Sequence, residues 1–157
     1  MTDWNQAFAF DEPFQEAVAA FLSRGVVTKA EFEQMSAAMK AKSWTVANVF
    51  AADEVQRIFE AAGASLEKGW TYAEFSKATQ DILTSPWHRE TVFRTSVLSG
   101  YGGGHWQQAW ETKELRPYVI YRDTGDGLVR SWHRLGGLVM PLDHPFVQSH
   151  WCPWEWN

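Results

Sequence analysis

The chain has 157 residues, a formal net charge of −5, ten tryptophans and one cysteine. This length fits one domain, or one domain with a helical extension. The single cysteine, Cys152, excludes an intramolecular disulfide scaffold and is expected to be a packing residue. The acidic balance argues against non-specific DNA binding, which depends on clustered Lys and Arg. No apolar run could span a bilayer and no signal peptide opens the chain, so we expect an intracellular protein without a membrane partner.

The N-terminal third predicts an irregular arm followed by helices. Residues 1–12 mix aromatic and polar side chains and form the arm. Apolar residues between Phe14 and Arg24 recur on one helical face, which Gly25 ends. Thr28 and Glu31 have the spacing of a capping box, and helical periodicity continues from there to Met39.

The next apolar pattern predicts a long helix, or a bent pair of helices, over residues 44–66. Thr71 and Glu74 form a second capping box that begins another helix. Ser85 ends that helix because the residue before a proline avoids the helical region, and Pro86 can begin the following one.

Residues 87–111 keep helical spacing but include four glycines within five positions, from Gly100 to Gly104. Each glycine weakens a helix by up to about 1 kcal/mol. A phosphate-binding loop does not fit, because no strand precedes the glycines and no Lys-Ser/Thr follows them. We expect close helix packing or a kink here.

After Pro117 the pattern becomes strand-like. Residues 118–121 and 128–132 could pair as a hairpin around a Gly-Asp-Gly turn, and residues 137–140 could add a third strand. The predicted fold class is therefore α+β, a helical N-terminal portion followed by a small antiparallel β element. We expect three segments within one compact unit: an arm and first helix over 1–27, a helical region over 28–112, and the β-rich element over 113–157.

Acids and histidines are dense in this last segment. Asp126, His133 and Asp143 are weak candidates for a metal site, although no pair has a diagnostic ligand spacing. Asp126 and His133 could also form an acid–base pair, but nothing marks a nucleophile beside them. Hydrogen bonding that holds short strands and loops together explains the cluster better. We therefore expect no catalytic residue, no metal and no cofactor.

Two other groups of side chains are candidates for binding. Glu90 and Arg94 have the spacing of a helical ion pair, and Arg94 is a candidate for a buried anchor; Arg89 and Arg94 beside hydroxyls could instead bind phosphate. Tryptophans without surrounding basic residues are expected to pack in the core or to contact a protein. The tryptophans singled out for such contacts are Trp106, Trp110, Trp132, Trp151, Trp154 and Trp156.

Three parts of the chain share the order and spacing of a known family. The helical part contributes residues 30–32, 43–46 and 71–75. The middle part contributes Arg89, Thr91, Arg94, Thr95, Tyr101 and Gly104. The last part contributes Asp126, Arg130, His133, Gly136, Gly137, Asp143, Pro145 and Phe146. Together they resemble the phage Mu F-like head morphogenesis family, the minor head proteins of tailed phages and prophages.

The resemblance implies a non-enzymatic structural protein of the virion or procapsid interior, assembled in the bacterial cytoplasm. Its implied partners are the portal, capsid or scaffold protein, and its implied role lies in head assembly and in DNA packaging or delivery. The family residues named above are expected to support the fold. Family members usually continue with Cys-Arg-Cys after the position of Asn157, so we expect either a cut sequence or a shortened relative.

Two other functions stay open at the level of sequence. A shortened head-protein relative could be a small phage-encoded inhibitor that binds a host defence complex. A metal-dependent hydrolase would use Asp126, His133 and Asp143. The acidic net charge argues against direct binding to DNA as the function.

Overall fold

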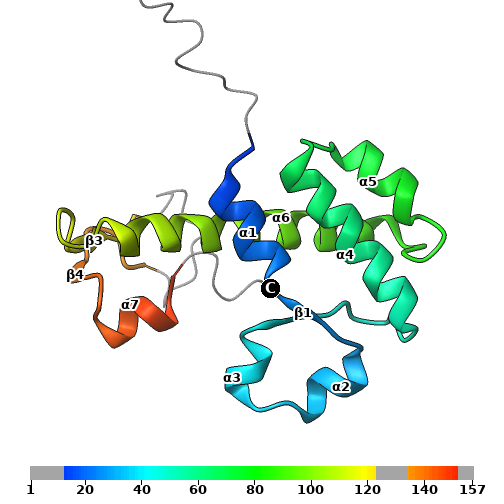
Figure 1. Ribbon diagram of the computed structural model, residues 1–157, viewed down its shortest axis with the longest axis horizontal. Helices are drawn as coiled ribbons and strands as arrows, with labels where there is room; N and C mark the ends of the chain where they lie inside the picture. The colour runs from blue at the N-terminus through cyan, green and yellow to red at the C-terminus, as the bar shows by residue number, and fades with distance from the viewer. Residues whose placement is uncertain (1–12, 123–133, 152–157) are drawn as a thin grey trace, which may run out of the picture. The chain divides into compact units, whose positions relative to one another are not determined.

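The computed structural model describes residues 13–122 and 134–151, and the chain forms two compact units, Met1–Gly104 and His105–Asn157. The first is helical with one short parallel strand pair, and the second contains a small antiparallel sheet (Figure 1). The predicted α+β class, with helices first and the antiparallel element after them, is confirmed.

The N-terminal unit begins with helix α1 (Gln15–Leu22), which leads into strand β1 (Gly25–Val26). This strand pairs in parallel with β2 (Ser43–Trp44). The connection between the strands carries two short helices, α2 (Lys29–Gln34) and α3 (Ala37–Lys40). The continuous helical periodicity expected up to Met39 is interrupted, because the backbone of Met35 is extended and Ser36 begins a new helix as its N-cap.

Helix α4 (Ala52–Glu67) begins later than the apolar pattern predicted. Trp44 lies in β2, and Val46 and Val49 lie in the loop that follows it, with all three side chains buried. The expected helix over residues 44–51 is wrong. Asn48 shows the physical reason, since its φ of 61° belongs to the left-handed region and cannot continue a right-handed helix.

Both capping boxes are confirmed. The Glu31 carboxylate accepts hydrogen bonds from the backbone N–H of Thr28 at 2.8 Å and from its hydroxyl at 2.7 Å. Glu74 accepts the equivalent bonds from Thr71, at 2.7 and 3.0 Å, at the start of α5 (Tyr72–Thr79). These bonds to the ionised form lower the pKa of both carboxyl groups. As expected, the next helix, α6 (Pro86–Glu111), begins at the proline.

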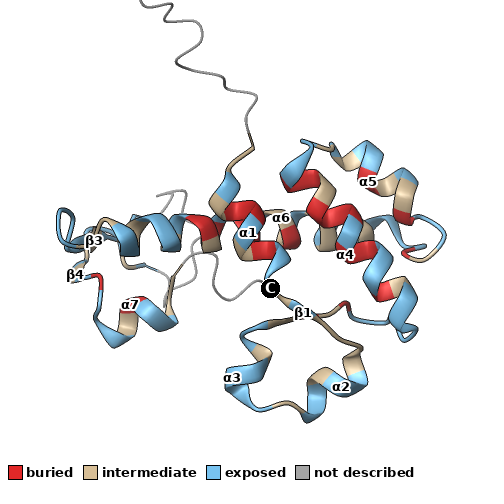
Figure 2. Cartoon of the chain, viewed as in Figure 1, coloured by how far each residue is buried: buried red, intermediate tan, exposed pale blue. Residues whose placement is uncertain are grey.

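The core of the N-terminal unit lies where α1, α4 and α5 meet, and Figure 2 shows buried residues concentrated along α1 and α4. Phe21 of α1 stacks on Phe59 of α4 with ring centroids 4.7 Å apart. Trp44 packs edge-on against Phe59 at 5.3 Å. Phe75 of α5 completes the aromatic core and is 0% exposed. Burial of side chains this large is the main term that stabilises such a unit.

The glycine-rich segment continues the helix, and α6 runs through it without interruption. A Cβ built on Gly100 would lie 2.6 Å from Cδ1 of Leu66 in α4, and one on Gly104 would lie 2.5 Å from the backbone nitrogen of Ala17 in α1. Real Cβ atoms do not approach this closely. Close helix packing, one of the two expectations from sequence, is confirmed for these glycines.

The C-terminal unit follows the end of α6 with strand β3 (Tyr118–Ile120), strand β4 (Val139–Pro141) and helix α7 (Pro145–Ser149). The strands are antiparallel, so that Val119 pairs with Met140. Strands were expected at both places. The expected strand over residues 128–132 lies outside the described residues. Leu142 and Val147 form the buried centre of this unit and are both 0% exposed.

Candidate functional site

Three of the six candidate tryptophans pack together in the C-terminal unit and are called the aromatic cluster here. Trp106 and Trp110 stand one turn apart on α6, and their rings stack with centroids 5.5 Å apart. Trp151, beyond α7, meets Trp106 edge-on at 5.0 Å. Trp110 remains 44% exposed. The other three candidates, Trp132, Trp154 and Trp156, lie outside the described residues.

Lys113 joins the aromatic cluster to the turn before α7. Its Nζ lies 5.0 Å from the ring centroid of Trp110 and 2.8 Å from a carboxylate oxygen of Asp143. The hydrogen bond from Lys113, and then its charge, lower the pKa of Asp143. Asp143 and Lys113 therefore form an ion pair that links the end of α6 to the turn before α7.

The C-terminal sheet exposes apolar side chains on one of its faces. Tyr118 lies opposite Pro141 and Ile120 opposite Val139, so these four side chains share a face because strand residues alternate. All four are exposed, with 65% of Tyr118, 53% of Ile120 and 57% of Val139 accessible. We call them the exposed sheet face. A solvated face of an antiparallel sheet is normally polar, so apolar residues here are typical of a contact surface.

A hollow of about 420 Å³ lies beside this sheet. The described residues that line it include Ile120, Tyr121 and Trp151. Tyr121 donates a hydrogen bond from its hydroxyl to the backbone oxygen of His150 at 3.3 Å, which ties β3 to the end of α7. The hollow has the size and the aromatic lining that could accept a large apolar side chain of a partner.

The residues before α7 form a helix start. The His144 ring nitrogen accepts a hydrogen bond from the backbone N–H of Phe146 at 3.1 Å, and Pro145 occupies the first turn, where its missing N–H has no cost. The Phe146 ring stacks on His150 at 4.0 Å. Gly137 has a φ of 85°, a conformation that glycine adopts without strain. These contacts give His144, Pro145 and Gly137 structural roles that require no catalytic or metal-binding function.

Asp126, Arg130 and His133 lie outside the described residues, so the structure does not place them. Within residues 13–122 and 134–151, no group of three His, Cys, Asp or Glu side chains could hold a metal ion. The hypotheses of a metal site and of an acid–base pair remain predictions from sequence.

The candidate residues at the start of α6 do not converge on one site. Arg89 donates a hydrogen bond to the backbone oxygen of Leu83 and so supports the loop before the helix. Arg94 forms the expected ion pair with Glu90 at 3.8 Å. Its side chain is 65% exposed, so the expectation of a buried anchor is wrong. A position on the solvent side of the helix explains this result.

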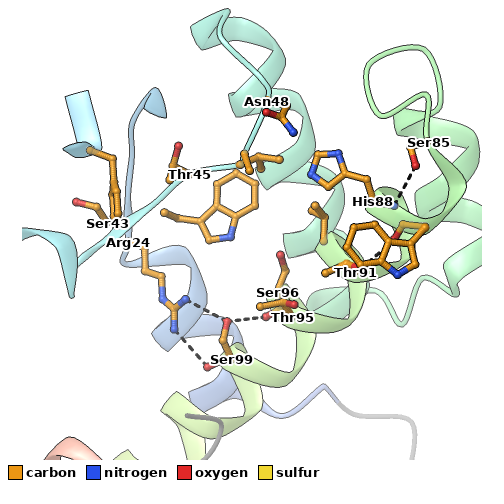
Figure 3. A pocket seen from close by; sticks show the side chains of 16 residues that line it. Arg24, Ser43, Thr45, Asn48, Ser85, His88, Thr91, Thr95, Ser96 and Ser99 are labelled. Atoms are coloured by element: carbon orange, nitrogen blue, oxygen red, sulfur yellow. Dashed lines mark hydrogen bonds between the residues drawn. The ribbon is translucent and has the colours of Figure 1, made fainter. Parts of the chain in front are cut away.

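Two further candidates lie on α6: Thr91 makes a local contact, and Tyr101 packs against the residue that precedes α1. Thr91 donates a hydrogen bond to the backbone oxygen of Trp87 at 2.9 Å. Tyr101 stacks on Phe14 with ring centroids 5.9 Å apart. Thr91 and Thr95 also line a groove of about 680 Å³ in the N-terminal unit (Figure 3).

Sequence reasoning missed the arginine that belongs to this groove. Arg24, at the end of α1, reaches Ser99 of α6 and donates to its hydroxyl at 3.1 Å and its backbone oxygen at 3.3 Å. A single arginine beside a helix-ending glycine carries no signal by itself. Only the fold brings it together with a serine seventy-five positions later.

Among the described residues, no helix is both long and apolar enough to cross a membrane. No protein-family model matches this chain. No solved structure matches it. The chain is 30% identical over 176 aligned positions to a protein of Escherichia phage Mu named putative capsid assembly protein F. The alignment covers 96% of this chain but only 40% of that relative. The predicted resemblance to the phage Mu F-like head morphogenesis family is therefore confirmed.

Proposed function

We propose that this protein acts in the assembly of a phage head, as a non-enzymatic structural protein that binds portal, capsid or scaffold protein. The observation that carries the proposal is the alignment, which extends over 96% of the chain, with a relative named as a putative capsid assembly protein. The chain spans 40% of that relative, so the proposed activity is that of the aligned part.

The exposed sheet face and the adjoining hollow are the proposed docking surface. Tyr118, Ile120 and Val139 are more than half exposed, and burying apolar surface contributes roughly 25 cal/mol per Å². Aromatic residues dominate the energetics of many interfaces because they bury a large area with little loss of side-chain entropy. An acidic chain of net charge −5 suits a protein partner better than the DNA backbone.

The proposed place of action is the interior of the procapsid or virion, with assembly in the bacterial cytoplasm. This location follows from the family and from the proposed partners. A contribution to DNA packaging or delivery would then be indirect, through the portal.

Co-expression with the portal, major capsid and scaffold proteins of the same phage tests the proposal. We expect the chain to co-purify with at least one of them and to sediment with procapsids. The double variant Ile120→Lys/Val139→Lys should abolish co-purification, because charges on the exposed sheet face oppose desolvation. Phe50→Lys is the matched control, since Phe50 is 75% exposed in the N-terminal unit. Absence of the chain from procapsids and from all three complexes would remove the proposal.

A further inference from the structure

The groove of the N-terminal unit follows one face of α6. Its α6 side is formed by residues that recur every three or four positions from Ser85 through His88, Val92 and Ser96 to Ser99. At 1.5 Å per residue this face extends about 21 Å. The opposite side is the segment 43–48, formed by β2 and the loop after it (Figure 3). An extended peptide rises about 3.3 Å per residue, so about six residues would fit along it.

Arg24 stands at the Ser99 end of this groove, with its Cζ 5.8 Å from the centroid of the Phe21 ring and no carboxylate of the described residues paired with it. Its side chain is half-buried, and burial lowers its pKa from the ordinary value. Its guanidinium donates to Ser99, yet it takes part in no ion pair among the described residues. A desolvated cation is costly unless a carboxylate or similar anion accompanies it. A guanidinium group has five N–H donors, so the two hydrogen bonds to Ser99 leave other donors of Arg24 available for a ligand.

The rest of the lining lacks acidic groups. The chain has 19 Asp and Glu residues, but none is among the described residues that line the groove. Thr45 also borders the groove, and its buried hydroxyl has no hydrogen-bond partner among the described residues. At the other end lie His88 and the first turn of α6, where the helix dipole favours negative charge.

Apolar rings complete the lining. Trp44 forms part of the wall, and Trp87, 75% exposed, stands at the start of α6. Nucleic acid would need several cations along its backbone, whereas this groove offers one arginine among mostly apolar and hydroxyl groups. A peptide supplies both an apolar side chain for the rings and backbone groups for the hydroxyls.

We propose that the groove along α6 binds an extended peptide segment of a partner protein, with a carboxylate of that segment on Arg24 and an apolar side chain against Trp87. The site lies within the N-terminal unit, apart from the exposed sheet face, and it does not depend on the function proposed above.

Binding to four defined probes tests this proposal with the full chain. The first is a pool of eight-residue peptides with Glu fixed at one position among random apolar and small residues. The second has Gln at that position, the third has phosphoserine, and the fourth is a single-stranded oligonucleotide. Tryptophan fluorescence and calorimetry report binding. We expect the Glu pool to bind about tenfold more tightly than the Gln pool, since a charge-assisted hydrogen bond is lost in the latter.

Variants then locate the bound pool. Arg24→Gln should lower affinity for the Glu pool about tenfold, and Arg24→Lys should restore part of it. Thr91→Trp, at an exposed position that lines the groove, should block binding without disturbing the core. Arg94→Gln is the matched control, because Arg94 lies on the same helix but not in the groove. If Arg24→Gln does not unfold cooperatively and so is not folded, the affinity of Thr91→Trp for the Glu pool tests the proposal by itself.

Three results would overturn the proposal. The first is equal binding of the Glu and Gln pools, or no binding of either. The second is unchanged affinity in Thr91→Trp together with unchanged affinity in a folded Arg24→Gln. The third is preference for the phosphoserine pool or the oligonucleotide, which would assign the groove to another ligand class. Loss of procapsid association without loss of peptide binding would instead count only against the proposed head-assembly role.

Discussion

Gly104 of α6 lies directly against the backbone of Ala17 in α1, so that a Cβ on this glycine would be 2.5 Å from the Ala17 nitrogen. Backbone cannot yield as a flexible side chain can. Gly104→Ala should therefore destabilise the protein by about 1–3 kcal/mol, as overpacked sites do, even though alanine favours helix by about 1 kcal/mol. Chemical denaturation measures this difference.

Gly25→Ala is the control for that substitution. Its Cβ would meet its nearest neighbour, the backbone oxygen of Lys42, at 3.9 Å, an ordinary van der Waals distance. We expect a change within about 0.5 kcal/mol. An increase in melting temperature for Gly104→Ala would mean that helix propensity outweighs packing and that the two helices are not in close contact.

Phe75 should be among the most sensitive core positions. It is 0% exposed and packs against Phe93 with ring centroids 5.3 Å apart. Phe75→Ala should cost about 3–5 kcal/mol because it removes buried apolar area and leaves a cavity. Phe50→Ala, at a residue that is 75% exposed, should cost less than about 0.5 kcal/mol. Thermal melting of the pair compares them directly, and equal losses would contradict the assigned core.

Asn48 should tolerate glycine better than alanine. Its φ of 61° lies in the left-handed region, where a Cβ costs about 1–2 kcal/mol unless the side chain compensates as Asn does. We expect Asn48→Ala to lower the free energy of unfolding by about 1 kcal/mol and Asn48→Gly to change it little. Urea titration of both variants gives the comparison. A harmless alanine would show that the loop adopts another conformation in solution.

The ion pair between Lys113 and Asp143 should make stability depend on pH in the acid range. The folded pKa of Asp143 is lowered by Lys113, so its stabilising contribution is complete above the unfolded pKa, about 3.9. It is lost as pH falls from there through the folded pKa. Asp143→Asn should thus lower the melting temperature at pH 7, and the difference from the wild type should shrink below about pH 4.

Lys113→Met checks the partner in that pair. If the two groups act through one another, the effects of Asp143→Asn and Lys113→Met will not add in the double variant. Additive effects at pH 7, or a difference that persists at pH 2, would show that the ion pair contributes nothing.

Local rules predicted much of the helical framework. The boxes Thr28/Glu31 and Thr71/Glu74 and the helix start at Pro86 are decided by bonds and sterics within a few residues, so the chain itself specifies them. The residues that carry the family resemblance were readable for the same reason, as ordered short motifs. Trp110, Trp151 and Asp143 were candidates from sequence, but their contacts with Trp106 and Lys113 could not be predicted from it.

The amino-acid sequence by itself determined the fold class, most helix starts and the family resemblance. Tertiary structure decided the rest. The glycine-rich segment is helical because Gly100 and Gly104 let α6 pack closely against Leu66 of α4 and Ala17 of α1. The dispersion energy of this packing is not part of the intrinsic helix propensity of glycine. It also brought Arg24 to Ser99, since contacts between distant residues depend on how helices pack and not on any local pattern.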